Sequence, residues 1–114
     1  MMRDGLRAII EQTDDMDVVG EMGDEGAALS LVERLRPDVV LVDLELKGSA
    51  SLDFIDLLSH SALRPRVIAM ATYPDDSAAH RALRCGAVST FLKTSGRDDI
   101  LETIRRSWSE RRSI

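Results

Sequence analysis

The sequence predicts a single α/β domain in which helices cover both faces of a doubly wound parallel sheet. Short apolar runs alternate with amphipathic stretches of helical spacing along the 114 residues. Strict alternation with short connections is typical of parallel sheets. Residues 39–42 are all apolar, as in a strand that is buried on both faces. The length allows one hydrophobic core, so we expect one domain spanning residues 1–114.

The elements of the first half follow from periodicity and from start and stop signals. A first helix begins almost at residue 1, because four apolar residues share one face: Met2, Leu6, Ile9 and Ile10. A polar turn at 13–17 leads to a short strand at 18–21. Asp24 is a suitable N-cap for the next helix, which Pro37 ends. The central strand then spans residues 38–43.

The second half repeats the alternation. A helix is predicted at 51–59 and a buried strand at 67–71. A Pro-Asp-Asp sequence opens, and a glycine closes, the helix within residues 74–86, which matches the usual positions of both residue types. The last strand spans residues 87–92. The last helix follows a capping box at residues 95–98 and ends in an arginine-rich tail.

Composition and charge exclude several classes of function. The net charge of −5 disfavours nucleic acids and anionic membranes as partners. No apolar run approaches the length of a membrane span, and no signal-peptide pattern opens the chain. The lone Cys85 cannot form an internal disulfide, which favours the reducing cytoplasm. We therefore expect a cytoplasmic protein that contacts neither membrane nor nucleic acid through this chain.

Three predicted strands end in polar side chains. Asp43 ends the central strand, Thr72 follows the next and Lys93 follows the last. Parallel strands place their carboxyl ends at one edge of the sheet, where open α/β sheets bind ligands. A carboxylate and an ammonium at this edge form either a structural ion pair or a site for an anion, and the residue types alone leave both readings open.

Six short segments occur in an order and spacing that are specific when taken together: residues 3–7 (RDGLR), 18–21 (VVGE), 36–44 (RPDVVLVDL), 81–83 (RAL), 85–87 (CGA) and 91–93 (FLK). Through them the chain resembles the receiver domains of two-component response regulators, of the NarL/FixJ type. The resemblance runs from residue 2 to about residue 107. It implies the flavodoxin-like receiver fold without its usual first strand.

The resemblance also implies roles for individual residues. Asp43 matches the phosphoacceptor, which takes a phosphoryl group from a phosphohistidine on a sensor histidine kinase. Lys93 matches the lysine that pairs with that phosphoryl group, and Thr72 offers a hydroxyl to it. The family's Mg²⁺ would be held by Asp43 and by the backbone carbonyl of Glu45.

The sequence departs from the family at several positions. The acidic pair that ends the family's first strand is missing, and Asp14-Asp15 comes too late in the chain to replace it. The switch Ser/Thr position holds Ala71 and the switch aromatic position holds Thr90; Phe91 is one residue too late and faces the opposite side. Phosphoryl transfer depends on electrostatic stabilisation, so these departures predict weak or absent Mg²⁺-dependent phosphorylation.

Two functions remain. The first is a receiver-like signalling module phosphorylated on Asp43; the second is a pseudo-receiver that uses the same fold for protein contacts or dimerisation without phosphorylation. An enzyme is not expected beyond self-phosphorylation, because no catalytic triad, zinc spacing or phosphate-binding glycine loop is present. We expect no output domain in residues 1–114. Three explanations of the absent strand remain open: a true start that lies upstream of residue 1, a four-stranded sheet in which the strand at 18–21 pairs with the central strand, or a homodimer that supplies the missing strand.

Overall fold

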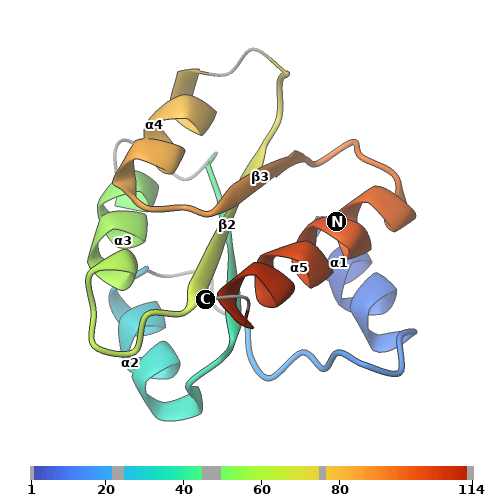
Figure 1. Cartoon of the computed structure of the whole chain (residues 1–114), viewed down its shortest axis with the longest axis horizontal. Helices are drawn as coiled ribbons and strands as arrows, with labels where there is room; N and C mark the ends of the chain where they lie inside the picture. Colours follow the sequence, from blue (N-terminus) through green and yellow to red (C-terminus); the bar gives the residue numbers. More distant parts are fainter. Residues whose placement is uncertain (1, 22–24, 45–49, 75–76, 113–114) are drawn as a thin grey trace.

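The described part of the chain contains five helices and three strands, which alternate from α2 onward (Figure 1). The computed structural model describes residues 2–21, 25–44, 50–74 and 77–112. The elements in order are α1 (Met2–Glu11), α2 (Glu25–Leu35), β1 (Val39–Asp43), α3 (Ala50–Ser59), β2 (Arg66–Ala71), α4 (Ser77–Cys85), β3 (Ser89–Leu92) and α5 (Arg97–Arg112). The predicted alternation is confirmed from α2 onward, whereas no strand lies between α1 and α2 in the described residues.

The three strands form one parallel sheet in the order β1-β2-β3. Asp43 is the register partner of Met70, and Ala71 is the partner of Leu92. β2 lies in the middle, and all its residues after Arg66 are buried. This burial on both faces explains why the sequence of β2 is an uninterrupted apolar run rather than an alternating one.

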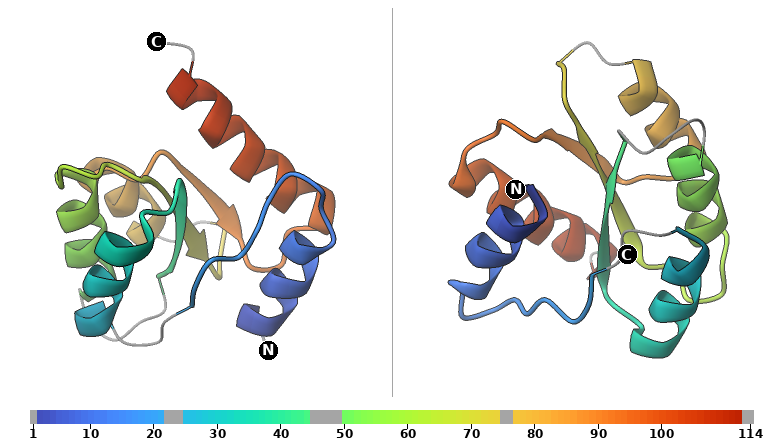
Figure 2. Two further views of the ribbon diagram at one scale, coloured as in Figure 1. Left: turned by 90° about the horizontal axis from the view of Figure 1, so that it is seen from below. Right: turned by 180° about the vertical axis from the view of Figure 1, so that it is seen from behind.

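Helices pack on both faces of the sheet, with α2, α3 and α4 on one side and α1 and α5 on the other (Figure 2). Alternate strand residues point to opposite faces, so each face has its own core. The α2–α4 side is built around Val42, Val67, Ala69, Phe54, Ile55 and Leu58. The α1/α5 side is built around Leu6, Ile68, Met70, Phe91, Ile100 and Ile104.

The strand predicted at 18–21 is wrong, because residues 16–21 have no regular secondary structure. The segment instead packs against α2: a Cβ added at Gly20 would lie 2.7 Å from Cδ1 of Leu35. The side chain of Val19 is 57% exposed. A short apolar segment forms a strand only when a neighbouring strand completes its hydrogen bonds. The described residues therefore form a three-stranded sheet and not the expected four-stranded one.

Two predicted helix ends have different outcomes. Gly86 closes α4 as predicted: its φ of +123° suits only glycine, and the Ala87 amide donates to the Ala82 carbonyl over 3.0 Å. The capping box at 95–98 is wrong. The Ile100 amide donates to the Gly96 carbonyl over 3.1 Å, which makes Gly96 the N-cap. The hydroxyl of Ser95 accepts instead from the Leu92 amide.

The segment after α1 is held by ion pairs. Asp15 accepts two hydrogen bonds from Arg105 of α5, of 2.9 and 3.0 Å, and these bonds lower the pKa of the Asp15 carboxyl. Glu21 pairs with Arg7 of α1. The polar turn predicted at 13–17 is thus confirmed as a surface segment, although Arg105 has a partner that the sequence did not indicate. None of the helices in the described residues is both long enough and apolar enough to cross a bilayer.

Candidate functional site

Asp43 and Lys93 meet at the carboxyl edge of the sheet. Nζ of Lys93 lies 2.8 Å from Oδ1 of Asp43. Asp43 is the last residue of β1, and Lys93 directly follows β3. The parallel topology therefore brings together two residues that are 50 positions apart, as the strand pattern predicted.

The Asp43–Lys93 ion pair crosses the end of β2, because β2 lies between β1 and β3 in the sheet. Hydrogen bonds extend the ladder on both sides of β2. The Leu44 amide donates to the Met70 carbonyl over 3.0 Å, and the Lys93 amide donates to the Ala71 carbonyl over 2.8 Å. The Lys93 side chain is 12% exposed and that of Asp43 is 32% exposed. The lysine is thus positioned by the sheet while the carboxylate stays open to a reagent from solvent.

Thr72 lies at the end of β2, between the two charged residues. Its Oγ1 atom is buried and has no hydrogen-bond partner among the described residues. Ile68 and Met70 of β2 belong to the α1/α5 core, so alternation places Thr72 on that side too. Leu41 packs against the same core, and alternation puts Asp43 on the same side. Thr72 and Ala71 therefore point to opposite sides of the sheet. This agrees with the alternation of side chains expected from the sequence.

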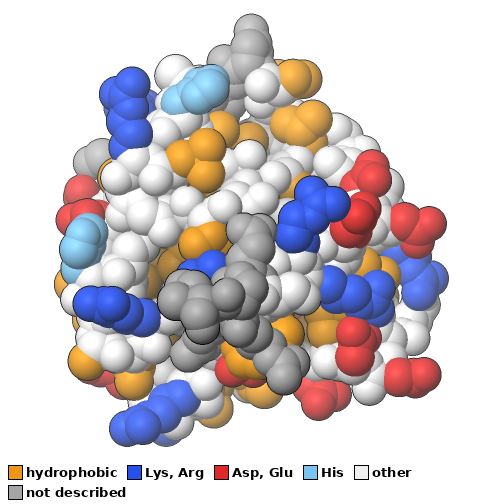
Figure 3. Space-filling view, viewed as in Figure 1, with side chains coloured by type: hydrophobic (Ala, Val, Ile, Leu, Met, Phe, Trp, Pro, Cys, Tyr) orange, Lys and Arg blue, Asp and Glu red, His pale blue; other side chains and the backbone are white. Residues whose placement is uncertain are grey.

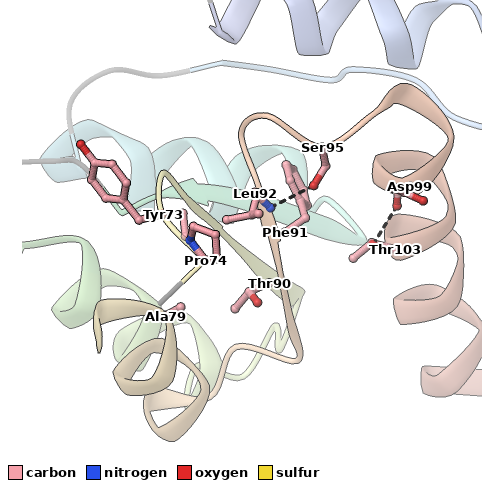
Figure 4. Close-up of a pocket in the computed structure, with 10 residues that line it drawn as sticks. Tyr73, Pro74, Ala79, Thr90, Phe91, Leu92, Ser95, Asp99 and Thr103 are labelled. Atoms are coloured by element: carbon pink, nitrogen blue, oxygen red, sulfur yellow. Dashed lines mark hydrogen bonds between the residues drawn. The ribbon is translucent and has the colours of Figure 1, made fainter. Parts of the chain in front are cut away.

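By alternation, Ala71 and Thr90 point to the other side of the sheet. They line a pocket of about 340 Å³ at the β3 edge, between α4 and α5 (Figure 4). Figure 4 shows Tyr73 turned away from Thr90 at the edge of this pocket, and Tyr73 is 65% exposed. Phe91 also lines this pocket, but it is buried in the α1/α5 core, which agrees with the predicted opposite orientation of Thr90 and Phe91. The small side chains at the two switch positions leave this pocket unfilled by an aromatic ring.

Charge is mixed on the face shown in Figure 3. Acidic and basic side chains are interleaved over the part of the surface that Figure 1 assigns to α1 and α5. On this face no extended basic patch gathers that would attract a polyanion.

Comparison with known proteins connects this arrangement to a family. The model of the response regulator receiver domain matches residues 1–105. The chain belongs to the response regulator receiver domain family. This finding confirms the resemblance, and the chain is thus a signalling domain of the two-component type.

The curated relatives of this chain are response regulators and a transcriptional regulatory protein. The chain is 32% identical over 105 residues to the transcriptional regulatory protein LiaR of Bacillus subtilis, covering 92% of this chain and 50% of LiaR. It is 33% identical over 105 residues to the nitrate/nitrite response regulator NarP of Escherichia coli, covering 92% and 49%. The receiver domain described here thus spans about half the length of the curated relatives it matches.

Solved structures confirm the receiver fold. The signal receiver domain of the putative response regulator NarL from Mycobacterium tuberculosis superimposes with a TM-score of 0.85 at 27% identity, covering 95% of this chain and 87% of that one. The response regulator domain of Thermotoga maritima CheB gives a TM-score of 0.83 at 29% identity, covering 95% and 88%.

Receiver domains typically bind Mg²⁺, but the described residues of this one do not fit such a site. Among them, no group of three or more Asp, Glu, His or Cys side chains lies close enough to hold an ion. Glu45, whose carbonyl was expected to be a ligand, lies outside the described residues. Asp15 is hydrogen-bonded to Arg105, and Figure 1 shows its segment at the end of the molecule opposite to the end of β1.

Two features of the site were not evident from the sequence. The unpartnered hydroxyl of Thr72 depends on what surrounds the end of β2, and the pocket beside Ala71 and Thr90 depends on the spacing of α4 and α5. The only sequence signal for the pocket is the small size of both switch residues. No sequence pattern reports whether a threonine hydroxyl has a partner.

Proposed function

We propose that this receiver domain accepts a phosphoryl group on Asp43 and that, in the 114-residue chain, the reaction is slow. The observation that carries the proposal is the ion pair of 2.8 Å between Asp43 and Lys93 at the carboxyl edge of the sheet. This ion pair supports the phosphoacceptor role because the Asp43 carboxylate is accessible from solvent and lies next to the less exposed ammonium of Lys93. The proposed donor is a sensor histidine kinase, which places the domain in the cytoplasm.

The proposed step is a nucleophilic substitution at phosphorus. A carboxylate oxygen of Asp43 attacks the phosphorus atom of the phosphohistidine. An O–P bond forms, the P–N bond breaks, and the imidazole nitrogen leaves with the electron pair and takes up a proton. The Lys93 ammonium remains protonated and moves its hydrogen bond from the carboxylate to a phosphoryl oxygen, where it offsets the added negative charge.

The proposed slow rate follows from two groups that are missing among the described residues of the site: a hydroxyl at position 71 and an acidic cluster that could hold a cation. Ala71 has no hydroxyl to donate to a phosphoryl oxygen, and no acidic cluster among the described residues holds a cation beside Asp43. Loss of one preorganised donor commonly reduces a rate by about 10²–10³-fold. Lys93 thus supplies most of the electrostatic stabilisation in the described site.

A pseudo-receiver is the second candidate, and the pocket of about 340 Å³ favours it. Ala71 and Thr90 leave both switch positions without the side chains that the family uses there. A domain of this kind would present its α4, β3 and α5 surfaces to a partner or to a second copy without phosphorylation. Slow phosphorylation and constitutive binding are distinguished by whether Asp43 accepts phosphate at all.

The test is incubation with acetyl phosphate, with and without MgCl₂, followed by intact mass spectrometry. The expected result is an adduct of one phosphoryl group that forms on the parent and is absent from Asp43→Asn. The matched control is Asp38→Asn, because Asp38 is an exposed carboxylate at the other end of the same strand. A folded parent without an adduct would overturn the phosphoacceptor role and leave the pseudo-receiver.

A further inference from the structure

We infer that the hydroxyl of Thr72 is a binding group for the oxyanion at Asp43 and takes the place of the hydroxyl that Ala71 cannot supply. Thr72 would donate a hydrogen bond to a phosphoryl oxygen beneath the Lys93 side chain. The inference rests on the proposed function. It adds a residue whose hydroxyl gains a hydrogen bond only when Asp43 carries the phosphoryl group.

The register of the sheet places Thr72 beside Lys93. Ala71 pairs with Leu92, and the 2.8 Å bond from the Lys93 amide to the Ala71 carbonyl continues the ladder to this point. Continuing this register by one residue places Thr72 opposite Lys93. Because Nζ of Lys93 reaches Asp43 on the far side of β2, the ion pair crosses the strand end that carries Thr72.

The state of the hydroxyl supplies the second argument. Oγ1 of Thr72 is buried, and none of the described residues gives it a hydrogen bond. A buried hydroxyl without a partner destabilises a protein. A valine of the same shape would avoid this cost, so the hydroxyl at this position makes sense when an oxygen of a bound group completes its hydrogen bond.

The Thr72 hydroxyl is therefore expected to destabilise the unmodified protein and to stabilise the protein that carries an oxyanion on Asp43. In the unmodified protein the buried hydroxyl has lost water and has no hydrogen-bond partner among the described residues, so it lowers stability. With an oxyanion on Asp43 it donates a charge-assisted hydrogen bond, which is stronger than a neutral one. The variant Thr72→Val is expected to be more stable than the parent when unmodified and to bind an oxyanion more weakly.

Ser59 provides a matched control within the same chain. Its Oγ is the other buried side-chain atom without a partner in the described residues. Ser59 ends α3 and contacts the space around Gly86, so it belongs to the α3–α4 contact and not to the Asp43 edge. Ser59→Ala removes a hydroxyl of the same kind without changing the proposed binding group.

The experiment measures thermal unfolding of the parent, Thr72→Val, Thr72→Ser and Ser59→Ala with increasing beryllofluoride, a phosphoryl mimic that coordinates a carboxylate. The unmodified Thr72→Val protein is expected to melt about 4 °C above the parent. Its apparent affinity for beryllofluoride is expected to fall about tenfold. Thr72→Ser should restore the affinity, and Ser59→Ala should leave it unchanged.

Three results would overturn the inference: equal beryllofluoride affinity in the parent and Thr72→Val, no binding by the parent, or a Thr72→Val protein that is less stable than the parent. The acetyl phosphate assay separates this failure from failure of the proposed function. A parent that forms the Asp43 adduct, with Thr72→Val binding beryllofluoride normally, removes only the role of Thr72. A parent without an adduct, in which Thr72→Val still weakens beryllofluoride binding, removes only the phosphoacceptor role.

Discussion

The two sides of the sheet differ in what they contribute at the carboxyl edge. On the α1/α5 side, an aspartate, a lysine and a buried threonine hydroxyl gather at the strand ends, above a small core. On the α2–α4 side, the core is larger, but Ala71 and Thr90 of this side supply no charged group and line a pocket of about 340 Å³. The groups that we propose to bind the phosphoryl group therefore point to one side, and the residues at the family's switch positions point to the other.

Under the proposed function, binding of a phosphoryl group and its readout would therefore depend on different side chains of this domain. Asp43 and Lys93 are positioned by strand pairing, which the sheet maintains whatever side chains line the pocket. Readout requires a second arrangement of side chains at the switch positions, and two small residues offer little to rearrange. The following experiments alter one side at a time.

The largest effect is expected from the core of the α2–α4 side. Leu58 of α3 is fully buried, and Leu58→Ala should lower the free energy of unfolding by about 2–5 kcal/mol. Urea denaturation measures this loss. Leu6→Ala on the α1/α5 side is the comparison, since Leu6 is also buried but belongs to the smaller cluster. An equal or greater loss for Leu6→Ala would contradict the ranking of the two cores.

The second effect concerns the cation of the α1/α5 side. Lys93→Met removes the positive charge beside Asp43 and keeps a long side chain, so phosphorylation by acetyl phosphate should slow by about 10²–10³-fold. The rate of adduct formation by intact mass measures it. Lys93→Arg retains the charge and should lose much less. A Lys93→Met protein that reacts at the parent's rate would show that another group stabilises the transferring phosphoryl.

A smaller effect is expected from filling the pocket beside Ala71 and Thr90. Thr90→Phe places a ring beside Ala71, where the pocket has room for it, and should raise stability by about 1 kcal/mol through added apolar burial. The melting temperature measures the gain. The rate of acetyl phosphate labelling should not change, because Asp43 lies across the sheet. A changed rate would mean that the two sides are coupled.

The smallest effect is expected at the surface pair of Asp15 and Arg105. Its hydrogen bonds lower the pKa of the Asp15 carboxyl in the folded protein, so the stabilisation is present above the ordinary carboxyl pKa and is lost as the pH falls through the lowered value. Asp15→Asn should slightly reduce stability at neutral pH and low salt, and not at acidic pH. Melting curves at both pH values check this, and equal losses at the two would refute it.

Much of the fold and part of the site were predictable from local sequence. Apolar runs without alternation predicted buried parallel strands, and Gly86 predicted the end of α4, because both signals depend on nearby residues. The meeting of Asp43 and Lys93 was predictable because parallel topology brings all strand ends to one edge. The opposite orientation of Phe91 followed from the two-residue period of a strand.

Tertiary structure decided the rest. Residues 18–21 have the composition of a strand, but without a paired neighbour they pack against α2 as an irregular segment. The pairing of Asp15 with Arg105, 90 positions later, depends on where α5 crosses the end of the turn. The burial of the Thr72 hydroxyl without a partner among the described residues depends on what packs around the end of β2. Local sequence specifies which elements form, whereas hydrogen-bond partners and burial are properties of residues distant in the chain that only folding brings together.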